Sequence, residues 1–275
     1  MDNTLDSPAA GTTAGGGNAA LNDMLRGVTN WDFWLTLAWV DIKGRYRRTL
    51  LGPFWSVLNS LLFVLVLASV YSLLWRIDLA TFLPFLTAGY FTWTFFAACI
   101  AESASCLYAA GETLKTMPVS PMALLMRVIA RNLMVFAHNL AIFICIALVF
   151  GVPLHMVLLV IPGILILALT CLGVGTAIAF LCSRFRDFEQ IVQSVLQILF
   201  FVSPILWQSR LLPAGSAALA DYNPVFHLLR IVRDPLLGSA PPLGSYLAAL
   251  LIMILSLLIG SAAYLKFRDQ LAYWL

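Results

Sequence analysis

The stretch that decides the fold is Asp41-Ile42-Lys43-Gly44-Arg45-Tyr46-Arg47-Arg48-Thr49-Leu50-Leu51-Gly52-Pro53-Phe54-Trp55. It carries four cationic side chains ahead of a Gly-Pro pair, and a long uncharged stretch begins directly after it. A Lys or Arg side chain is costly at the centre of a bilayer but gains roughly 1 kcal/mol beside anionic cytoplasmic lipid. The pattern therefore predicts a membrane entry, with this end of the chain on the cytoplasmic side.

The composition predicts an integral membrane protein. The chain of 275 residues is 61% hydrophobic and 11% charged, with a mean hydropathy of +0.93, whereas soluble domains are about 25% charged. The net charge of +3 is small, and the basic residues lie beside apolar segments, as expected for contact with membrane lipid. These features give no support for a nucleic-acid partner.

Apolar stretches predict six membrane-spanning helices, because a span needs about 20 mostly apolar residues. They lie at about 56–75, 82–108, 128–150, 155–181, 190–207 and 245–265, and six crossings place both termini in the cytoplasm. This topology satisfies the positive-inside rule. It puts 12 of the 16 Lys and Arg inside (Arg26, Lys43, Arg45, Arg47, Arg48, Lys115, Arg127, Arg131, Arg184, Arg186, Lys266, Arg268) and 4 outside (Arg76, Arg210, Arg230, Arg233).

The N-terminal segment changes character near Trp31. Residues 1–22 have neither the basic nor the apolar region of a signal peptide, and we expect them to form a disordered cytoplasmic tail before a transmembrane domain at 23–275. From Trp31, apolar residues recur at helical spacing, which predicts an amphipathic interface helix over about 30–50. The alternative is the first turn of a tilted membrane helix, although Asp32 and Asp41 argue against deep insertion.

The stretch at 41–55 resembles, almost residue for residue, the D-I-K-x-R-Y-R-x-T-x-L-G-P-x-W signature of the membrane subunits of type-2 ABC exporters for O-antigen, teichoic acid and capsular polysaccharide. Supporting matches are Arg184-Phe185-Arg186-Asp187 followed by Ile191-Val192 and Ser203-Pro204, and the terminal Ala272-Tyr273-Trp274-Leu275. Together they cover the chain from about Trp31. The resemblance implies an all-α permease that associates with two copies of a separate ATPase subunit. Such a permease exports a lipid-linked polysaccharide across the bacterial inner membrane.

The chain lacks the motifs that would make it an enzyme. No G-x-x-x-x-G-K followed by Ser or Thr occurs in it, so the P-loop device for holding nucleotide phosphates is absent. We therefore expect no cofactor, metal or catalytic site on this chain, with ATP and Mg bound by the partner subunit. A path wide enough for a polymer is most simply built at a symmetric interface, which predicts a homodimer.

Two segments are predicted to couple the chain to its ATPase. The loop at 111–121 is polar and contains two prolines; the resemblance implies that it holds the coupling helix, although the pattern also fits an ordinary connecting loop. The resemblance further implies that this loop and the basic interface segment transmit the movement of the ATPase to the membrane helices. The predicted coupling residues are Glu112, Lys115, Met117 and Pro118, and those of the interface or gate segment are Asp41, Lys43, Arg45, Tyr46, Arg47, Gly52 and Pro53.

The stretch at about 208–242 mixes apolar and charged residues, which predicts short re-entrant helices before the last span, since irregular backbone in a bilayer must be buried or line water. The alternative is an amphipathic loop on the membrane surface. In similar exporters this region forms an outer gate, which would involve Asn223, Pro224, Arg230 and Arg233.

The substrate path is predicted from two patterns. Aromatic residues crowd the second span, and Gln190, Gln193, Ser194 and Gln197 recur at helical spacing on the fifth. Aromatic faces can stack on sugar rings, and an intramembrane carboxylate is a functional candidate. The candidates are Tyr90, Trp93, Glu102, Gln193 and Gln197. The alternatives are aromatic packing between helices, a pairing of Glu102 with a polar neighbour, and a proton relay in a secondary transporter.

Two other function classes remain open from the residues alone. A type-2 ABC exporter of a small hydrophobic compound would need no channel compatible with a polymer. A membrane enzyme acting on polyprenyl-linked sugars would need clustered acidic or basic groups, of which the outer loop offers Asp221, Arg230, Arg233 and Asp234. A gene neighbourhood containing an ATPase and glycosyltransferases would distinguish the three.

Overall fold

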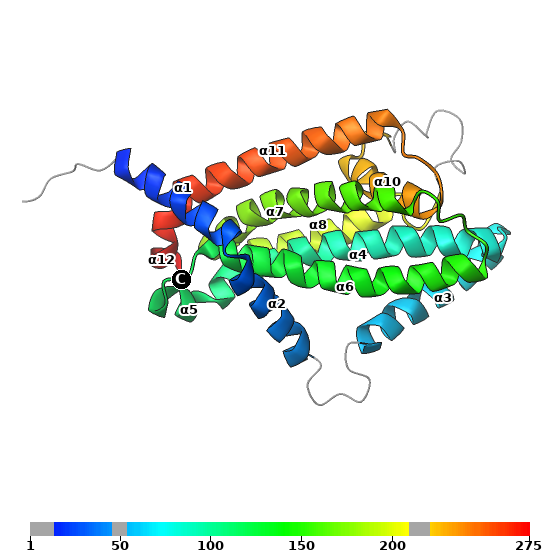
Figure 1. Cartoon of the computed structure of the whole chain (residues 1–275), viewed down its shortest axis with the longest axis horizontal. Helices are drawn as coiled ribbons and strands as arrows, with labels where there is room; N and C mark the ends of the chain where they lie inside the picture. Colours follow the sequence, from blue (N-terminus) through cyan, green and yellow to red (C-terminus); the bar gives the residue numbers. More distant parts are fainter. Residues whose placement is uncertain (1–13, 46–53, 209–220) are drawn as a thin grey trace, which may run out of the picture.

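The computed structural model describes residues 14–45, 54–208 and 221–275, and within these ranges every regular element is a helix. Figure 1 shows most of the long helices running along one axis. In chain order the elements are α1 (Ala14–Thr29), α2 (Trp31–Arg45), α3 (Phe54–Trp75), α4 (Leu79–Ala109), α5 (Gly111–Thr116), α6 (Pro121–Val149), η1 (Val157–Leu159), α7 (Val160–Arg184), α8 (Phe188–Val202), α10 (Pro224–Leu236), α11 (Leu243–Phe267), η3 (Arg268–Gln270) and α12 (Leu271–Trp274).

Five helical segments are long and apolar enough to cross a membrane: Leu58–Trp75, Leu79–Ala109, Pro121–Val149, Val157–Arg184 and Leu243–Trp274. They correspond to five of the six spans expected from hydropathy. The remaining one, at 190–207, forms a helix of only 15 residues, Phe188–Val202. At 1.5 Å per residue this helix rises about 22 Å, less than the roughly 30 Å of a hydrocarbon core. The multi-span, all-helical class is thus confirmed, whereas the count of six is not.

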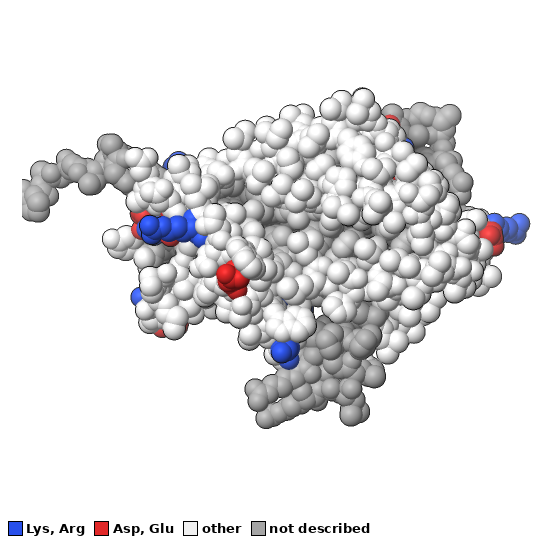
Figure 2. Space-filling view, in the orientation of Figure 1, with Lys and Arg blue, Asp and Glu red and all other residues white. Residues whose placement is uncertain are grey.

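The bundle has two distinct ends. We call the end that holds α1, α5 and α12 the proximal end. The distal end holds the α3–α4 connection at 76–78, the α6–α7 connection at 150–156 and α10 (Figure 1). Figure 2 shows charged side chains on the visible face toward the two ends and over α2, while the rest of this face is broadly uncharged. That distribution suits a bundle with its apolar middle in lipid.

α4 is the central helix and α3 a peripheral one. In the most apolar stretch of α4, 72% of the residues are buried within the chain, compared with 11% in that of α3. The core around α4 is built from large apolar side chains such as Phe82, Leu86 and Phe91. The outward faces of α3 and α11 are rich in exposed leucine and isoleucine, as expected for surfaces that face lipid or another subunit.

α7 and α11 cross at a contact made by glycines. A Cβ atom on Gly173 would lie 2.4 Å from the backbone carbon of Ser256, and one on Gly260 would lie 2.4 Å from the backbone oxygen of Gly173. No side chain fits at either position. Small residues of this kind let the backbones of membrane helices approach closely, which takes the place of a hydrophobic driving force between them.

The N-terminal segment differs from the disordered tail expected over 1–22, because α1 is helical from Ala14; residues 1–13 lie outside the described part. Tertiary contacts account for the helix. Asp23 accepts a hydrogen bond from the Tyr264 hydroxyl (2.6 Å) and pairs with Arg268 (3.2 Å) on the C-terminal segment. Its backbone oxygen accepts a hydrogen bond from Ser120. The two ends of the chain are thereby joined at the proximal end.

α2 occupies the segment where an interface helix over about 30–50 was expected, but it ends at Arg45. Its predicted apolar face divides in two. Ala38 and Ile42 are buried, and α2 packs on α6. Trp31 and Trp39 are 58% and 49% exposed on the outside. An indole ring exposed at the end of a membrane bundle suits headgroup depth, so α2 remains a candidate interface helix.

Candidate functional site

A groove lies between α4 and α8, with Phe63 of α3 at its edge. Its volume is about 660 Å³. The α4 wall carries Tyr90 and Trp93, whose spacing of three residues puts them on one side of the helix. Three alanines follow them on the same wall and leave room for a guest: Ala97, Ala98 and Ala101.

Aromatic contacts hold the α4 wall in place. The Tyr90 ring stacks on Phe63 with centroids 4.8 Å apart, and the Trp93 ring lies 5.8 Å from Phe200 of α8. Trp93 is only 5% exposed, so it contributes to the core as well as to the groove. Tyr90 is less deeply buried.

The α8 wall is polar. Gln190, Gln193, Ser194 and Gln197 line it, because residues at i, i+3, i+4 and i+7 share one helix face. The amides of Gln193 and Gln197 are exposed. Neither makes a hydrogen bond to another group in the described part of the chain. The groove thus pairs aromatic faces with amides that are available to a ligand or to water.

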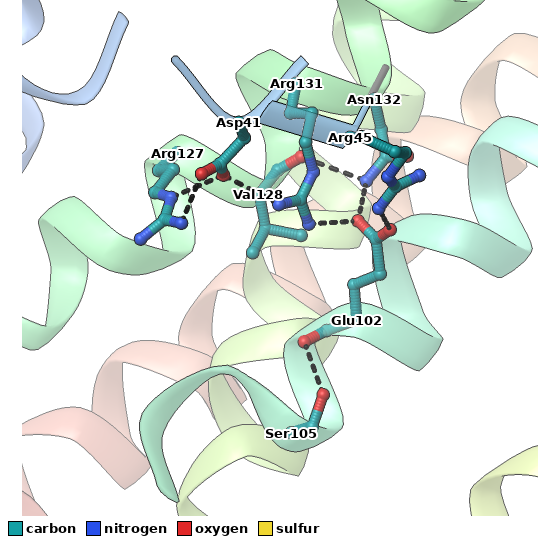
Figure 3. A network of polar contacts seen from close by, with 8 residues as sticks. All are labelled: Asp41, Arg45, Glu102, Ser105, Arg127, Val128, Arg131 and Asn132. Carbon is teal, nitrogen blue, oxygen red and sulfur yellow. Dashed lines mark hydrogen bonds and ion pairs between the residues drawn. The ribbon is translucent and has the colours of Figure 1, made fainter. Parts of the chain in front are cut away.

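A second site is a network of charges that joins α2, α4 and α6, drawn in Figure 3. Asp41 of α2 is bound by Arg127 of α6 through two nitrogens, with Nε at 2.6 Å from Oδ2. Arg131 lies between two carboxylates: Nη1 is 2.7 Å from Oδ2 of Asp41, and Nη2 is 2.5 Å from Oε2 of Glu102. Asn132 donates to the same Glu102 oxygen at 2.6 Å.

Arg45 completes this network from the last turn of α2, with Nη2 at 3.1 Å from Oε1 of Glu102. Three guanidinium groups therefore surround two carboxylates. Burial differs among them: the Arg131 side chain is 14% exposed and that of Arg45 is 52% exposed. Arg131 is the central member, because it alone of the three pairs with both carboxylates, although its Nε is buried without a hydrogen-bond partner. A cavity of about 360 Å³ adjoins the network and reaches Thr113 of α5.

The predicted coupling residues lie together at the proximal end. Glu112 and Lys115 are exposed on α5, and Met117 and Pro118 are exposed in the segment that follows it. Met117 is 59% exposed. The next helix, α6, begins at an ordered cap, because the Ser120 hydroxyl accepts a hydrogen bond from the Met122 amide.

The predicted outer-gate residues lie on α10 at the distal end. Asn223 caps this helix: its Oδ1 accepts from the Val225 amide at 3.0 Å, and its Nδ2 donates to Ser203 at 3.0 Å. Pro224 follows at the first helical position, where its fixed φ and missing N–H cost nothing. Arg230 and Arg233 stand one turn apart on the same helix, which packs against α4, α7 and α11.

The structure brings four of the five predicted substrate-path residues together in the groove. Tyr90, Trp93, Gln193 and Gln197 line the groove together. Glu102 does not line it; both of its oxygens are engaged by the charge network. Glu102 thus pairs with polar neighbours, as the sequence left open, and its place in the path stays a prediction.

The predicted interface or gate segment is described only in part. Asp41 and Arg45 belong to the charge network, and Lys43 is exposed with its ammonium 5.3 Å from the ring of Trp39. Four of its members, Tyr46, Arg47, Gly52 and Pro53, lie outside the described residues. The network roles of Arg127, Arg131 and Asn132 were not predicted. The signal that could have indicated them is the presence of two cations, Arg127 and Arg131, in a largely apolar stretch.

The fold and these sites define a multi-span helical membrane protein with a polar and aromatic groove and a charge network at one end. Comparison with known families identifies its class: the model of the ABC-2 type transporter family matches residues 33–237. The chain belongs to this family. It is thus a multi-pass membrane transport subunit of an ABC transporter.

Several curated relatives are similar over most of their length. An "O-antigen export system permease protein RfbA" of Klebsiella pneumoniae is 26% identical over 198 residues, covering 70% of this chain and 76% of the relative. A protein of the same name from Myxococcus xanthus is 26% identical, covering 80% and 87%. The "Polysialic acid transport protein KpsM" of Escherichia coli is 22% identical, covering 82% and 89%.

Proposed function

We propose that this chain is the permease subunit of an ABC exporter that moves a lipid-linked polysaccharide, O-antigen-like, across the bacterial inner membrane. A separate ATPase subunit binds ATP and Mg and hydrolyses the ATP. The names of the relatives support a polysaccharide as substrate. The observation that carries the proposal is the groove in which aromatic residues of α4 face the glutamines of α8.

The groove suits a chain of sugars because its contacts do not depend on one sugar identity. The partly exposed ring of Tyr90 can contact the C–H faces of sugar rings, while Trp93 is nearly buried and supports this wall. The amides of Gln193 and Gln197 can donate to and accept from hydroxyl groups. As a polymer slides through a path, each sugar must be able to take over the contacts of the sugar before it. The alanines opposite the glutamines leave space for such a chain.

We propose six crossings, with the proximal end in the cytoplasm. α8 leaves the proximal region after Arg184, and the chain continues as buried, non-helical residues Ser203 to Leu206. Gln208 then lines a cavity with α10 at the distal end. Irregular backbone can cross lipid when it is buried in protein, so α8 together with 203–208 can serve as the fifth crossing. α10 then serves as a re-entrant helix of the outer gate.

We propose that two copies of the chain form the working transporter. Phe63 of α3 lines the groove, and α3 buries little of its surface within its own chain. A second copy related by a twofold axis would close the groove into a path and cover apolar surface of both chains. Two ATPase subunits would complete the complex.

The ATPase would dock at α5 and the exposed segment that follows it, where Glu112, Lys115, Met117 and Pro118 project. The charge network offers a route from there to α2. It fixes α2 to α4 and α6 by ion pairs, and its cavity extends to Thr113 of α5. Because α5 contacts α4 and α4 carries Glu102 of the network, a displacement of α5 would be passed through α4 to α2.

The test replaces the amides of the groove. We expect the double variant Gln193→Leu, Gln197→Leu to slow export about tenfold or more, because two hydrogen-bonding groups worth about 1 kcal/mol each are lost. Lipid-linked glycan should accumulate on the cytoplasmic side of intact cells, measured by its protection from an impermeant lectin. Trp93→Ala is a poor probe, since Trp93 is nearly buried and its loss would create a cavity in the core.

Two further variants make the result specific. Gln197→Asn keeps an amide in the groove and should retain most export. Leu251→Ala changes the exposed face of α11, away from the groove, and should export at the parental rate. Parental export by the double leucine variant would show that the groove is not the path.

A further inference from the structure

A cavity of about 530 Å³ opens at the distal end between α4, α10 and the α6–α7 connection. Most of its wall is apolar and includes Phe85, Phe150 and Phe226. Its charged members come from one helix: Arg230, Arg233 and Asp234 of α10. The groove between α4 and α8 has no residue in common with this cavity.

The cations of this cavity outnumber the anions. Arg230 donates from Nε to Oδ2 of Asp234 at 3.0 Å. Arg233 is 6% exposed, and its Nε lies 3.8 Å from Oδ1 of the same Asp234, too far for a hydrogen bond. Its Nη1 donates to a neutral group, the backbone oxygen of Pro204, at 2.7 Å. Among the described residues that line the cavity, two guanidinium groups thus share one carboxylate, which leaves a net charge of +1.

Aromatic faces and burial do not remove this excess. The guanidinium of Arg233 lies 4.6 Å from the centre of the Phe85 ring, and that of Arg230 lies 5.4 Å from Phe226. Burial lowers the pKa of Arg233 to about 10, and Asp234 offsets part of that effect. Arg233 therefore remains charged at neutral pH. A desolvated cation without a full counter-charge is unfavourable, and a bound anion would relieve it.

We propose that this cavity binds the phosphodiester group of an anionic phospholipid. A phosphodiester carries one negative charge, which matches the excess of the cavity, and guanidinium groups bind phosphate oxygens well. The apolar wall can accept the glycerol and the first methylenes of the acyl chains. The cavity lies where candidate spans end, beside the connections at 76–78 and 150–156, which is the depth of lipid headgroups.

The experiment measures lipid binding to the purified full-length chain by native mass spectrometry. Its arms are phosphatidylglycerol, zwitterionic phosphatidylcholine and inorganic phosphate. We expect phosphatidylglycerol to bind about ten times more tightly than phosphatidylcholine, and millimolar phosphate not to displace it. Displacement by phosphate at that concentration would mean that the site recognises a free anion and would overturn the lipid assignment.

Variants of opposite charge test the electrostatic argument. Arg230→Gln removes the excess charge and should weaken phosphatidylglycerol binding about tenfold, because a charge-assisted contact is lost. Asp234→Asn raises the net charge to +2 and should strengthen binding several-fold, an effect that general damage to the fold would not produce. Arg76→Gln, on an exposed residue at the same end, should leave binding unchanged. Parental binding by both Arg230→Gln and Asp234→Asn would refute the proposal.

Discussion

The charge network at the proximal end and the groove between α4 and α8 both place polar groups on membrane helices, yet their partners differ. In the network, Glu102 and Asp41 have all of their carboxylate oxygens bound by Arg or Asn side chains. In the groove, the exposed amides of Gln193 and Gln197 have no partner within the described part of the chain. Polar groups that satisfy one another stabilise a structure, whereas unsatisfied, accessible ones are free for a ligand.

The largest effect that this comparison predicts follows removal of Arg131. We expect Arg131→Leu to lower the free energy of unfolding by about 3 kcal/mol, because it leaves two partly buried carboxylates without their shared cation. Chemical denaturation of the detergent-purified protein measures the change. The matched control is Arg45→Leu, in which a half-exposed guanidinium is lost and the expected cost is below about 1 kcal/mol. Equal losses of unfolding free energy for the two variants would contradict the claim that Arg131 stabilises the network more than Arg45 does.

The smallest effect on stability is predicted for the groove. Gln193→Leu together with Gln197→Leu should change the free energy of unfolding by no more than about 0.5 kcal/mol, because exposed amides without partners contribute little to the fold. The same denaturation measurement applies. A loss comparable to that of Arg131→Leu would show that these glutamines are structural, and the slower export of the double variant would then have no bearing on the path.

The sequence predicted the features that follow a local period. Long apolar stretches marked five spans, and the spacing of Gln190 to Gln197 marked a polar face that the structure turns toward Tyr90 and Trp93. The mixed apolar and charged pattern at about 208–242 predicted short helices before the last span, and α10 lies there. In each case the cause lies within a few residues of the effect.

Features that depend on distant residues were missed. Asp41 and Arg127 pair across 86 positions of sequence, and no single-sequence pattern selects that partner from the other cations. The pairing of Glu102 with Arg45, Arg131 and Asn132 could not be specified for the same reason. The helix of α1 was missed for the same reason: its composition suggests disorder, and its anchors are Ser120, Tyr264 and Arg268.

The apolar stretch at 190–207 illustrates a third case, in which hydropathy is correct about the burial of 203–206 but not about their conformation. Residues 203–206 are buried, as an apolar stretch suggests, yet the helix ends at Val202. Ser203 is extended, and Pro204 follows it. A residue before proline is disfavoured in the helical region, so this local signal competes with the apolar pattern and ends the helix early.

The most direct test of the account is photo-crosslinking from within the groove during export. A photoreactive amino acid replaces Gln197, and another replaces Ile259 on the exposed face of α11, in cells that synthesise the lipid-linked glycan. We expect position 197 to form an adduct that carries glycan, and position 259 to form none. Glycan adducts at position 259 and none at position 197 would contradict the claim that the polymer passes between α4 and α8.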